Sequence, residues 1–188
     1  MLNIPNTLTV ARIIVIPVIV ASFYFDKSVA AWTGCLLFIA AAVTDYFDGF
    51  LARHLKQTST FGRVLDPIAD KLLVSAVLLM LAFERRLGLS GYGIFPAVII
   101  MCREILVSGL REFLAEIKVG MPVTKLAKYK TAVQLVALPV LMVSKDTPVS
   151  WHFEILGEAF LWTAAVLTLI TGYDYLKQGL KYIYDKNN

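Results

Sequence analysis

The chain has 188 residues, of which 58% are hydrophobic and 17% are charged, and its mean hydropathy is +0.70. Soluble domains carry about 25% charged residues, so this composition disfavours a soluble helical bundle and favours an integral membrane protein. The net charge of +4 at pH 7 is less informative than the positions of the charges, and we expect no nucleic-acid partner.

Six apolar segments follow one another, and no linker, low-complexity tract or clear repeat divides them, so we expect a single domain over residues 1–188. Residues 1–12 can lie partly in the membrane interface, and residues 176–188 form a basic cytoplasmic tail. The expected membrane-spanning helices cover residues 8–25, 29–52, 61–83, 91–115, 125–144 and 153–175.

Three of these segments reach spanning length only if their ionisable residues belong to the helices. The uncharged parts of the second and third segments, residues 29–44 and 72–83, are shorter than the roughly 20 residues that a span needs. The fourth segment reaches that length only with Arg103, Glu104, Arg111 and Glu112. Ionisable groups at or just below a membrane surface are costly, and their usual role is functional. We therefore predict an all-α membrane protein of six transmembrane helices with a polar cavity that faces the cytoplasm.

The lysines and arginines of the expected loops give the orientation. Six spans place both termini on one side, and the connections at 53–60 and 116–128 lie on that side too. Cytoplasmic loops carry the excess of Lys and Arg, so both termini and the cavity are expected in the cytoplasm. The richer side holds Arg12, Arg53, Lys56, Arg63, Lys118, Lys125, Lys128, Lys130, Lys177, Lys181 and Lys186, and the other side holds Lys27, Arg85, Arg86 and Lys145.

Four aspartates lie in the second and third segments. Asp45 and Asp48 are three residues apart, and Asp66 and Asp70 are four apart, so each pair shares one face of a helix. The short loop between the two helices makes them antiparallel neighbours. Four carboxylates close together would repel one another, and a hard divalent cation would relieve that repulsion. Solvated helix ends are the simpler alternative.

Residues without bulk continue both aspartate faces. Gly49 and Ala52 follow Asp45 on its face, and Gly62 precedes Asp66 by one turn. This arrangement would let a bulky ligand approach the helix backbones. Arg53 follows directly and could hold a phosphate.

The complete string over residues 45–70, D-x2-D-G-x2-A-R-x8-G-x3-D-x3-D, resembles the signature of the CDP-alcohol phosphatidyltransferase family. The resemblance implies a six-helix membrane enzyme, usually a homodimer, that moves a phosphatidyl or similar group from a CDP-linked donor to an alcohol and releases CMP. "NIPNTLTVAR" at 3–12, "REILVSGLREF" at 103–113 and "KYKTAVQ" at 128–134 are similar to the members of the bacterial inner membrane that use sn-glycerol 3-phosphate as acceptor. Serine, inositol phosphate, choline-type alcohols and phosphatidylglycerol remain alternative acceptors.

The resemblance also implies roles for the aspartate segment. Two Mg²⁺ or Mn²⁺ ions would bind the pyrophosphate of CDP-diacylglycerol, and Asp70 would act as general base. Gly49, Ala52 and Gly62 would contact the cytidine and its ribose, and Arg53 the donor phosphates. The implied metal ligands are Asp45, Asp48, Asp66 and Asp70.

An anionic acceptor needs cations, and two helical stripes supply candidates. The stripes are Glu104, Ser108 and Arg111, and Lys128, Thr131 and Gln134. We expect Arg111 and Lys128 to contact the acceptor phosphate, with Arg103 and Lys130 as further candidates. The alternative is that the arginines pair with Glu104 and Glu112 while the lysines meet anionic lipid head groups.

The start of the chain also carries polar residues that match the family's pattern. Asn6, Thr9 and Arg12 either border the site or anchor the chain at the membrane surface.

Two other function classes compete with the family interpretation. An intramembrane prenyltransferase also uses aspartates and Mg²⁺ with a pyrophosphate donor, but its aspartate pairs lie on separated loops. A divalent-cation transporter would place its carboxylates near the middle of the bilayer, whereas these lie near the ends of two spans.

Overall fold

The computed structural model describes residues 4–25, 28–54, 60–117, 119–121, 124–147 and 150–187, and at 4–5, 46–54, 60–61, 63, 150–151 and 183–187 it covers the backbone alone. Within these ranges the chain is helical and contains no strand. The α-helices are α1 (Ile4–Ser22), α2 (Ser28–His54), α3 (Thr60–Phe83), α4 (Ile94–Glu116), α5 (Lys125–Val143) and α6 (Ser150–Asn187), and a short 3₁₀ helix, η1 (Ser144–Asp146), follows α5.

The helices match the six predicted segments, with differences at the two ends of the chain. Helix α1 begins at Ile4, so most of the segment expected in the interface belongs to the first helix. Helix α6 runs for 38 residues without a break, so residues 176–187 continue the last helix and do not turn away from it as a separate tail.

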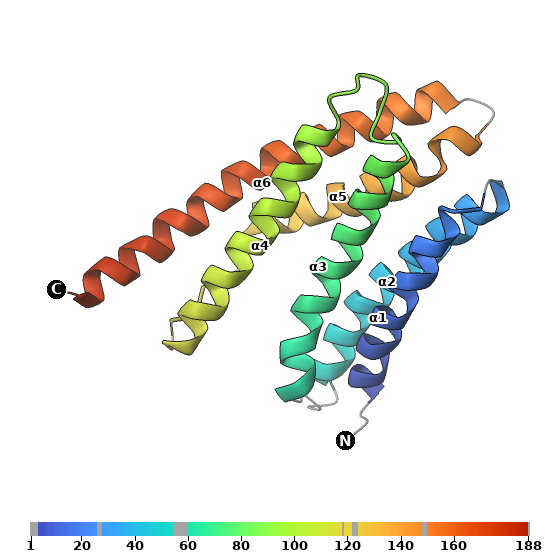
Figure 1. Ribbon diagram of the computed structural model, residues 1–188. Coiled ribbons are helices and arrows are strands. Elements are labelled where there is room, and N and C mark those ends of the chain that lie inside the picture. Colours follow the sequence, from blue (N-terminus) through green and yellow to red (C-terminus); the bar gives the residue numbers. More distant parts are fainter. Residues whose placement is uncertain are drawn as a thin grey trace.

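The helices alternate in direction and form two groups (Figure 1). Helix α1 packs against α2 and α3, and α6 packs against α4 and α5. The contact between α2 and α5 joins the groups. The start of α1 and the ends of α2, α4 and α6 lie toward one end of the molecule, and the ends of α1, α3 and α5 lie toward the other.

A continuous apolar core fills the space between the helices, while many large apolar side chains lie on the outside. The core includes Phe38, Leu81 and Leu138, each fully buried. Exposed apolar side chains of this size and number are characteristic of a surface that meets lipid. Within the described residues, three stretches are long and apolar enough to cross a membrane, namely Ser28–Asp45, Lys125–Asp146 and His152–Tyr182.

An ion pair ties the helix ends that lie opposite the aspartate segment. The Nη1 atom of Arg86, just after α3, lies 2.6 Å from Oδ2 of Asp146 in η1 and donates to the carbonyl of Met142 at 3.0 Å. Both charged side chains are mostly buried. This contact fastens the end of α3 to the end of α5.

Candidate active site

An arginine from α1 joins the two aspartate-bearing helices. The Nη1 atom of Arg12 lies 2.8 Å from Oδ1 of Asp45 on α2 and 2.8 Å from Oδ1 of Asp70 on α3. Arg12 is only 2% exposed. Because both oxygen atoms contact a single nitrogen, the two carboxylates lie close together, as expected for two helices whose aspartate faces converge.

A threonine one turn earlier on α1 makes the next contact. The hydroxyl of Thr9 donates to Oδ1 of Asp66 at 2.5 Å. Asn6, Thr9 and Arg12 are spaced by three residues and all are buried, so they form one polar face on an otherwise apolar helix. Between the two predicted roles for these residues, the geometry favours the one in which they border the site.

Helix α1 therefore organises the aspartate segment. It makes more extensive contacts with α2 and with α3 than these two helices make with each other. The short loop between α2 and α3 led us to expect neighbouring helices, and the two do contact each other. The buried polar face of α1 provides the surface on which their carboxylates converge.

A cavity of about 380 Å³ opens beside the aspartates. This volume falls within the range of about 300–1,000 Å³ that is usual for small-molecule sites. The five α-helices α2 to α6 contribute to its lining. The ionisable side chains in the lining are Asp45, Asp66, Asp70, Lys71, Arg103, Glu104, Arg111, Lys130 and Tyr175.

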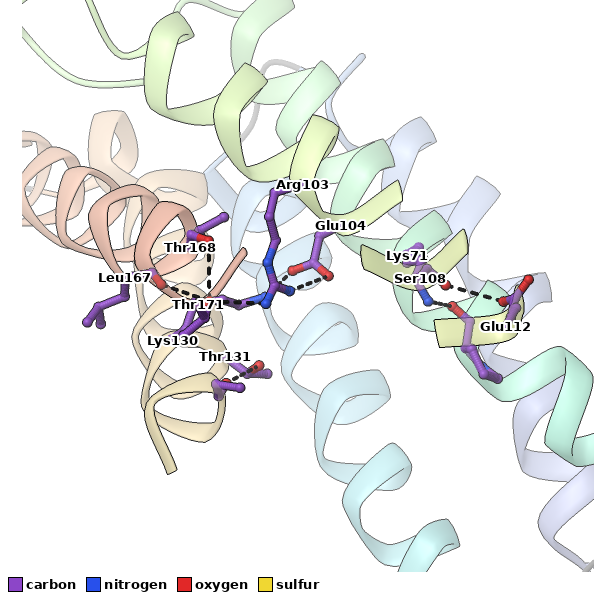
Figure 2. A network of polar contacts seen from close by, with 12 residues as sticks. Lys71, Arg103, Glu104, Ser108, Glu112, Lys130, Thr131, Leu167, Thr168 and Thr171 are labelled. Atoms are coloured by element: carbon purple, nitrogen blue, oxygen red, sulfur yellow. Dashed lines mark hydrogen bonds and ion pairs between the residues drawn. The ribbon is translucent and has the colours of Figure 1, made fainter. Parts of the chain in front are cut away.

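The basic wall of the cavity is a network between α4, α5 and α6 (Figure 2). Arg103 reaches across from α4 and donates through Nη2 to the hydroxyl of Thr171 at 3.0 Å. Its guanidinium carbon lies 5.6 Å from the ring centre of Tyr175, within the range of a cation–π contact. Glu104 lies between two cations, with Arg103 Nη1 at 3.7 Å on one side and Lys130 Nζ on the other.

The four basic residues that were predicted to bind the acceptor substrate occupy different environments. Lys130 is buried and paired with Glu104, so it does not face lipid head groups. Arg103 is also largely buried. Arg111 lines the cavity from the exposed side of α4. Lys128 is exposed, and the cavity is lined without it.

The predicted donor-binding residues fall largely outside the described side chains. Asp48, Gly49, Ala52 and Arg53 belong to α2, but the structure describes only their backbone. Gly62 is buried in α3, one turn before Asp66. Their contacts therefore stay predictions.

The carboxylate groups of the aspartate segment are ligands of the kind that a hard divalent cation prefers. Carboxylate oxygens are the preferred ligands of Mg²⁺, and the fold brings Asp45 and Asp70 together around the positive charge of Arg12. Among the described residues no group of three carboxylate, histidine or cysteine side chains has the arrangement of a metal site. The fourth aspartate, Asp48, lies outside that set.

Comparison with known proteins identifies the family. A model of the CDP-alcohol phosphatidyltransferase family matches residues 2–170. The chain belongs to this family. A relative from Rickettsia felis is 48% identical over 96% of this chain and 97% of its own length, and one from Cereibacter sphaeroides is 38% identical over 98% of each. Both are named CDP-diacylglycerol–glycerol-3-phosphate 3-phosphatidyltransferase. The family resemblance read from the aspartate signature is thus confirmed.

Beyond the residues of the family signature, the cavity is lined by residues to which the sequence interpretation assigned no role. Lys71 lines the cavity and donates to the carbonyl of Pro67 at 2.7 Å. Tyr175 lies under Arg103, and Gln134 lines the cavity from α5. Gln134 was visible as part of a polar stripe. For Lys71 and Tyr175 no spacing signal in the sequence pointed to the site.

Proposed function

We propose that this chain transfers the phosphatidyl group from CDP-diacylglycerol to sn-glycerol 3-phosphate, giving phosphatidylglycerophosphate and CMP in phosphatidylglycerol synthesis. The observation that carries this proposal is one cavity whose wall combines the signature aspartates Asp45, Asp66 and Asp70 with Arg103, Arg111 and other basic groups. The names of the full-length relatives support the same reaction.

The charges of the cavity suit phosphate-bearing substrates. Four acidic side chains in the lining are balanced by four basic ones, so a bound divalent cation would leave the cavity positive. A positive cavity favours glycerol 3-phosphate or inositol phosphate over serine as acceptor. The acidic set is Asp45, Asp66, Asp70 and Glu104, and the basic set is Lys71, Arg103, Arg111 and Lys130.

We assign the metal site to Asp45, Asp66 and Asp70 together with Asp48, which would hold two Mg²⁺ or Mn²⁺ ions. When bound, the ions would offset the charge that develops on the phosphates of the donor. Arg12 and Thr9 position the carboxylates for this role, since they contact Asp45, Asp66 and Asp70 directly.

Asp70 is the proposed general base. Its Oδ1 atom contacts Arg12, and its Oδ2 atom would take the proton of the primary hydroxyl of glycerol 3-phosphate. The hydroxyl oxygen then forms a bond to the phosphorus that carries the diacylglycerol. The bond from that phosphorus to the bridging oxygen breaks, and CMP leaves with the electron pair.

The substrates would occupy opposite sides of the aspartates. Gly49, Ala52 and Gly62 are proposed to accept the cytidine and ribose, and Arg53 the donor phosphates. For the acceptor phosphate we rank Arg111 first, because Arg103 and Lys130 already pair with Glu104. Those two would add positive charge and hold the wall in shape, and Lys128 would attract the anionic acceptor from outside.

The cellular setting follows from charge and composition. We propose that six helices span the bacterial inner membrane, with both termini and the cavity in the cytoplasm. The lysine and arginine bias supports this orientation. The protein would work as a homodimer in the lipid bilayer, as the family resemblance implies.

The test is CMP release by the purified protein in detergent. CDP-diacylglycerol is supplied with glycerol 3-phosphate, serine, inositol phosphate or phosphatidylglycerol, with Mg²⁺ or with EDTA, and the lipid product is identified by mass spectrometry. We expect CMP and phosphatidylglycerophosphate only with glycerol 3-phosphate and Mg²⁺. The Asp70→Asn variant should release no CMP. Faster turnover with another acceptor would reassign the substrate, and no CMP release with any alcohol would refute the proposal.

A further inference from the structure

One buried polar side chain in the cavity has not been given a role. Gln134 is 3% exposed and lines the cavity from α5. Its Oε1 atom has no hydrogen-bond partner among the residues that the structure describes. Buried polar atoms are nearly always paired, so an amide oxygen left in this state beside a cavity indicates a ligand that completes its hydrogen bonding.

The neighbours of Gln134 on α5 are already satisfied. Lys130, one turn earlier, pairs with Glu104. The hydroxyl of Thr131 donates to the carbonyl of Ala127 within its own helix at 3.1 Å. On this face of α5, Gln134 therefore supplies an uncharged polar group that remains available to a ligand.

The chemistry of the acceptor requires such a group. Glycerol 3-phosphate carries a phosphate, a primary hydroxyl and a secondary hydroxyl. In the proposed function the phosphate meets Arg111 and the primary hydroxyl meets Asp70. The secondary hydroxyl is then the one polar group of the acceptor without an assigned partner, and burying it in the cavity unpaired would be costly. The oxygen of an amide can accept a hydrogen bond from this hydroxyl without competing with Arg111 for the phosphate or with the aspartates for a metal.

We propose that Gln134 accepts a hydrogen bond from the secondary hydroxyl of glycerol 3-phosphate and thereby selects acceptors that carry a hydroxyl next to the reacting one. This inference rests on the proposed function. It assigns the recognition of the acceptor's carbon skeleton to α5, while the aspartates of α2 and α3 serve the donor and the chemistry.

The test compares two acceptors, glycerol 3-phosphate and 3-hydroxypropyl phosphate, which lacks the secondary hydroxyl. Full-length protein in detergent is supplied with CDP-diacylglycerol and Mg²⁺, and kcat/KM is measured for each acceptor by CMP release. We expect the unmodified protein to prefer glycerol 3-phosphate by roughly 10- to 100-fold, since a site built to bond a hydroxyl rejects the analogue that lacks it.

The Gln134→Met variant keeps the size of the side chain and removes its hydrogen bonding. Its preference for glycerol 3-phosphate should fall to about onefold, because kcat/KM for glycerol 3-phosphate falls while kcat/KM for the analogue stays the same. The matched control is Thr33→Val on α2, whose hydroxyl donates to the carbonyl of Val29 within its own helix and which lies outside the cavity lining. Its preference should equal that of the unmodified protein. Gln134→Asn, which shortens the amide, should lower the preference as well.

The outcomes separate this inference from the proposed function. If glycerol 3-phosphate is not an acceptor at all, the proposed function fails. If it is an acceptor but the unmodified protein treats both compounds alike, Gln134 has no such role, whatever the variants do. An unchanged preference in folded Gln134→Met or Gln134→Asn protein also refutes the inference.

Discussion

Replacing Arg12 by alanine would remove the cation that lies between Asp45 and Asp70. In protein held free of metal by EDTA, the two carboxylates would then repel each other. Breaking a fully buried ion pair by removing one partner costs about 3–5 kcal/mol. The side chains of Asp45 and Asp70 are 40% and 47% exposed, however, while that of Arg12 is 1% exposed.

These exposures set the expected magnitude. Water can solvate both carboxylates once Arg12 is gone, so the loss should be smaller than for a fully buried pair. We expect the free energy of unfolding to fall by about 2–3 kcal/mol in EDTA. With saturating Mg²⁺ the metal would offset the same repulsion and bind the folded state alone, so the loss should shrink to about half or less.

The measurement is unfolding in detergent followed by circular dichroism, with EDTA and with Mg²⁺. Arg86→Ala serves as the matched control, because it breaks the ion pair with Asp146 at the opposite ends of the helices. Its loss of stability should be the same in both buffers. An Arg12→Ala loss that does not depend on Mg²⁺, or no loss at all, would contradict the idea that Arg12 balances the charge of the metal-binding carboxylates.

Three further predictions concern the site. The Thr9→Val variant loses the hydrogen bond to Asp66, so its free energy of unfolding should fall by about 1–3 kcal/mol and its Mg²⁺ binding, measured by calorimetry, should weaken. An unchanged free energy of unfolding and an unchanged Mg²⁺ affinity would remove Thr9 from the site. Arg111→Gln should raise KM for glycerol 3-phosphate by about tenfold or more, whereas the exposed Lys128→Gln should change it by less than about threefold; equal effects would place Lys128 in the site. Chelation by EDTA should stop CMP release and excess Mg²⁺ should restore it, and activity in EDTA would exclude the metal role.

The helices and the arrangement of the aspartates on them could be predicted from patterns within short stretches of the sequence. The number of helices and most of their bounds followed from apolar length. The spacing of Asp66 and Asp70 placed both on one face of α3, and both line the cavity. These features depend on residues within one helix, where the period of 3.6 residues per turn determines which side chains share a face.

Partners on other helices could not be read in this way. Arg103 was predicted to bind the acceptor or to pair with neighbouring acids, and Lys130 to bind the acceptor or to meet lipid head groups. The structure shows Glu104 lying between the two cations. Lys128 and Lys130 are two residues apart, yet one is exposed and the other buried. Which face of α5 turns inward depends on how α6 and α2 pack against it.

The sequence by itself determined a helical membrane protein, the family and the four aspartates of its signature, because composition, helical period and a long signature string are local properties of the chain. Only the tertiary structure decided that Thr9 and Arg12 reach those carboxylates. Arg12 contacts Asp45 and Asp70 across 33 and 58 residues of sequence, and a pairing over such distances is set by the packing of α1 between two helices.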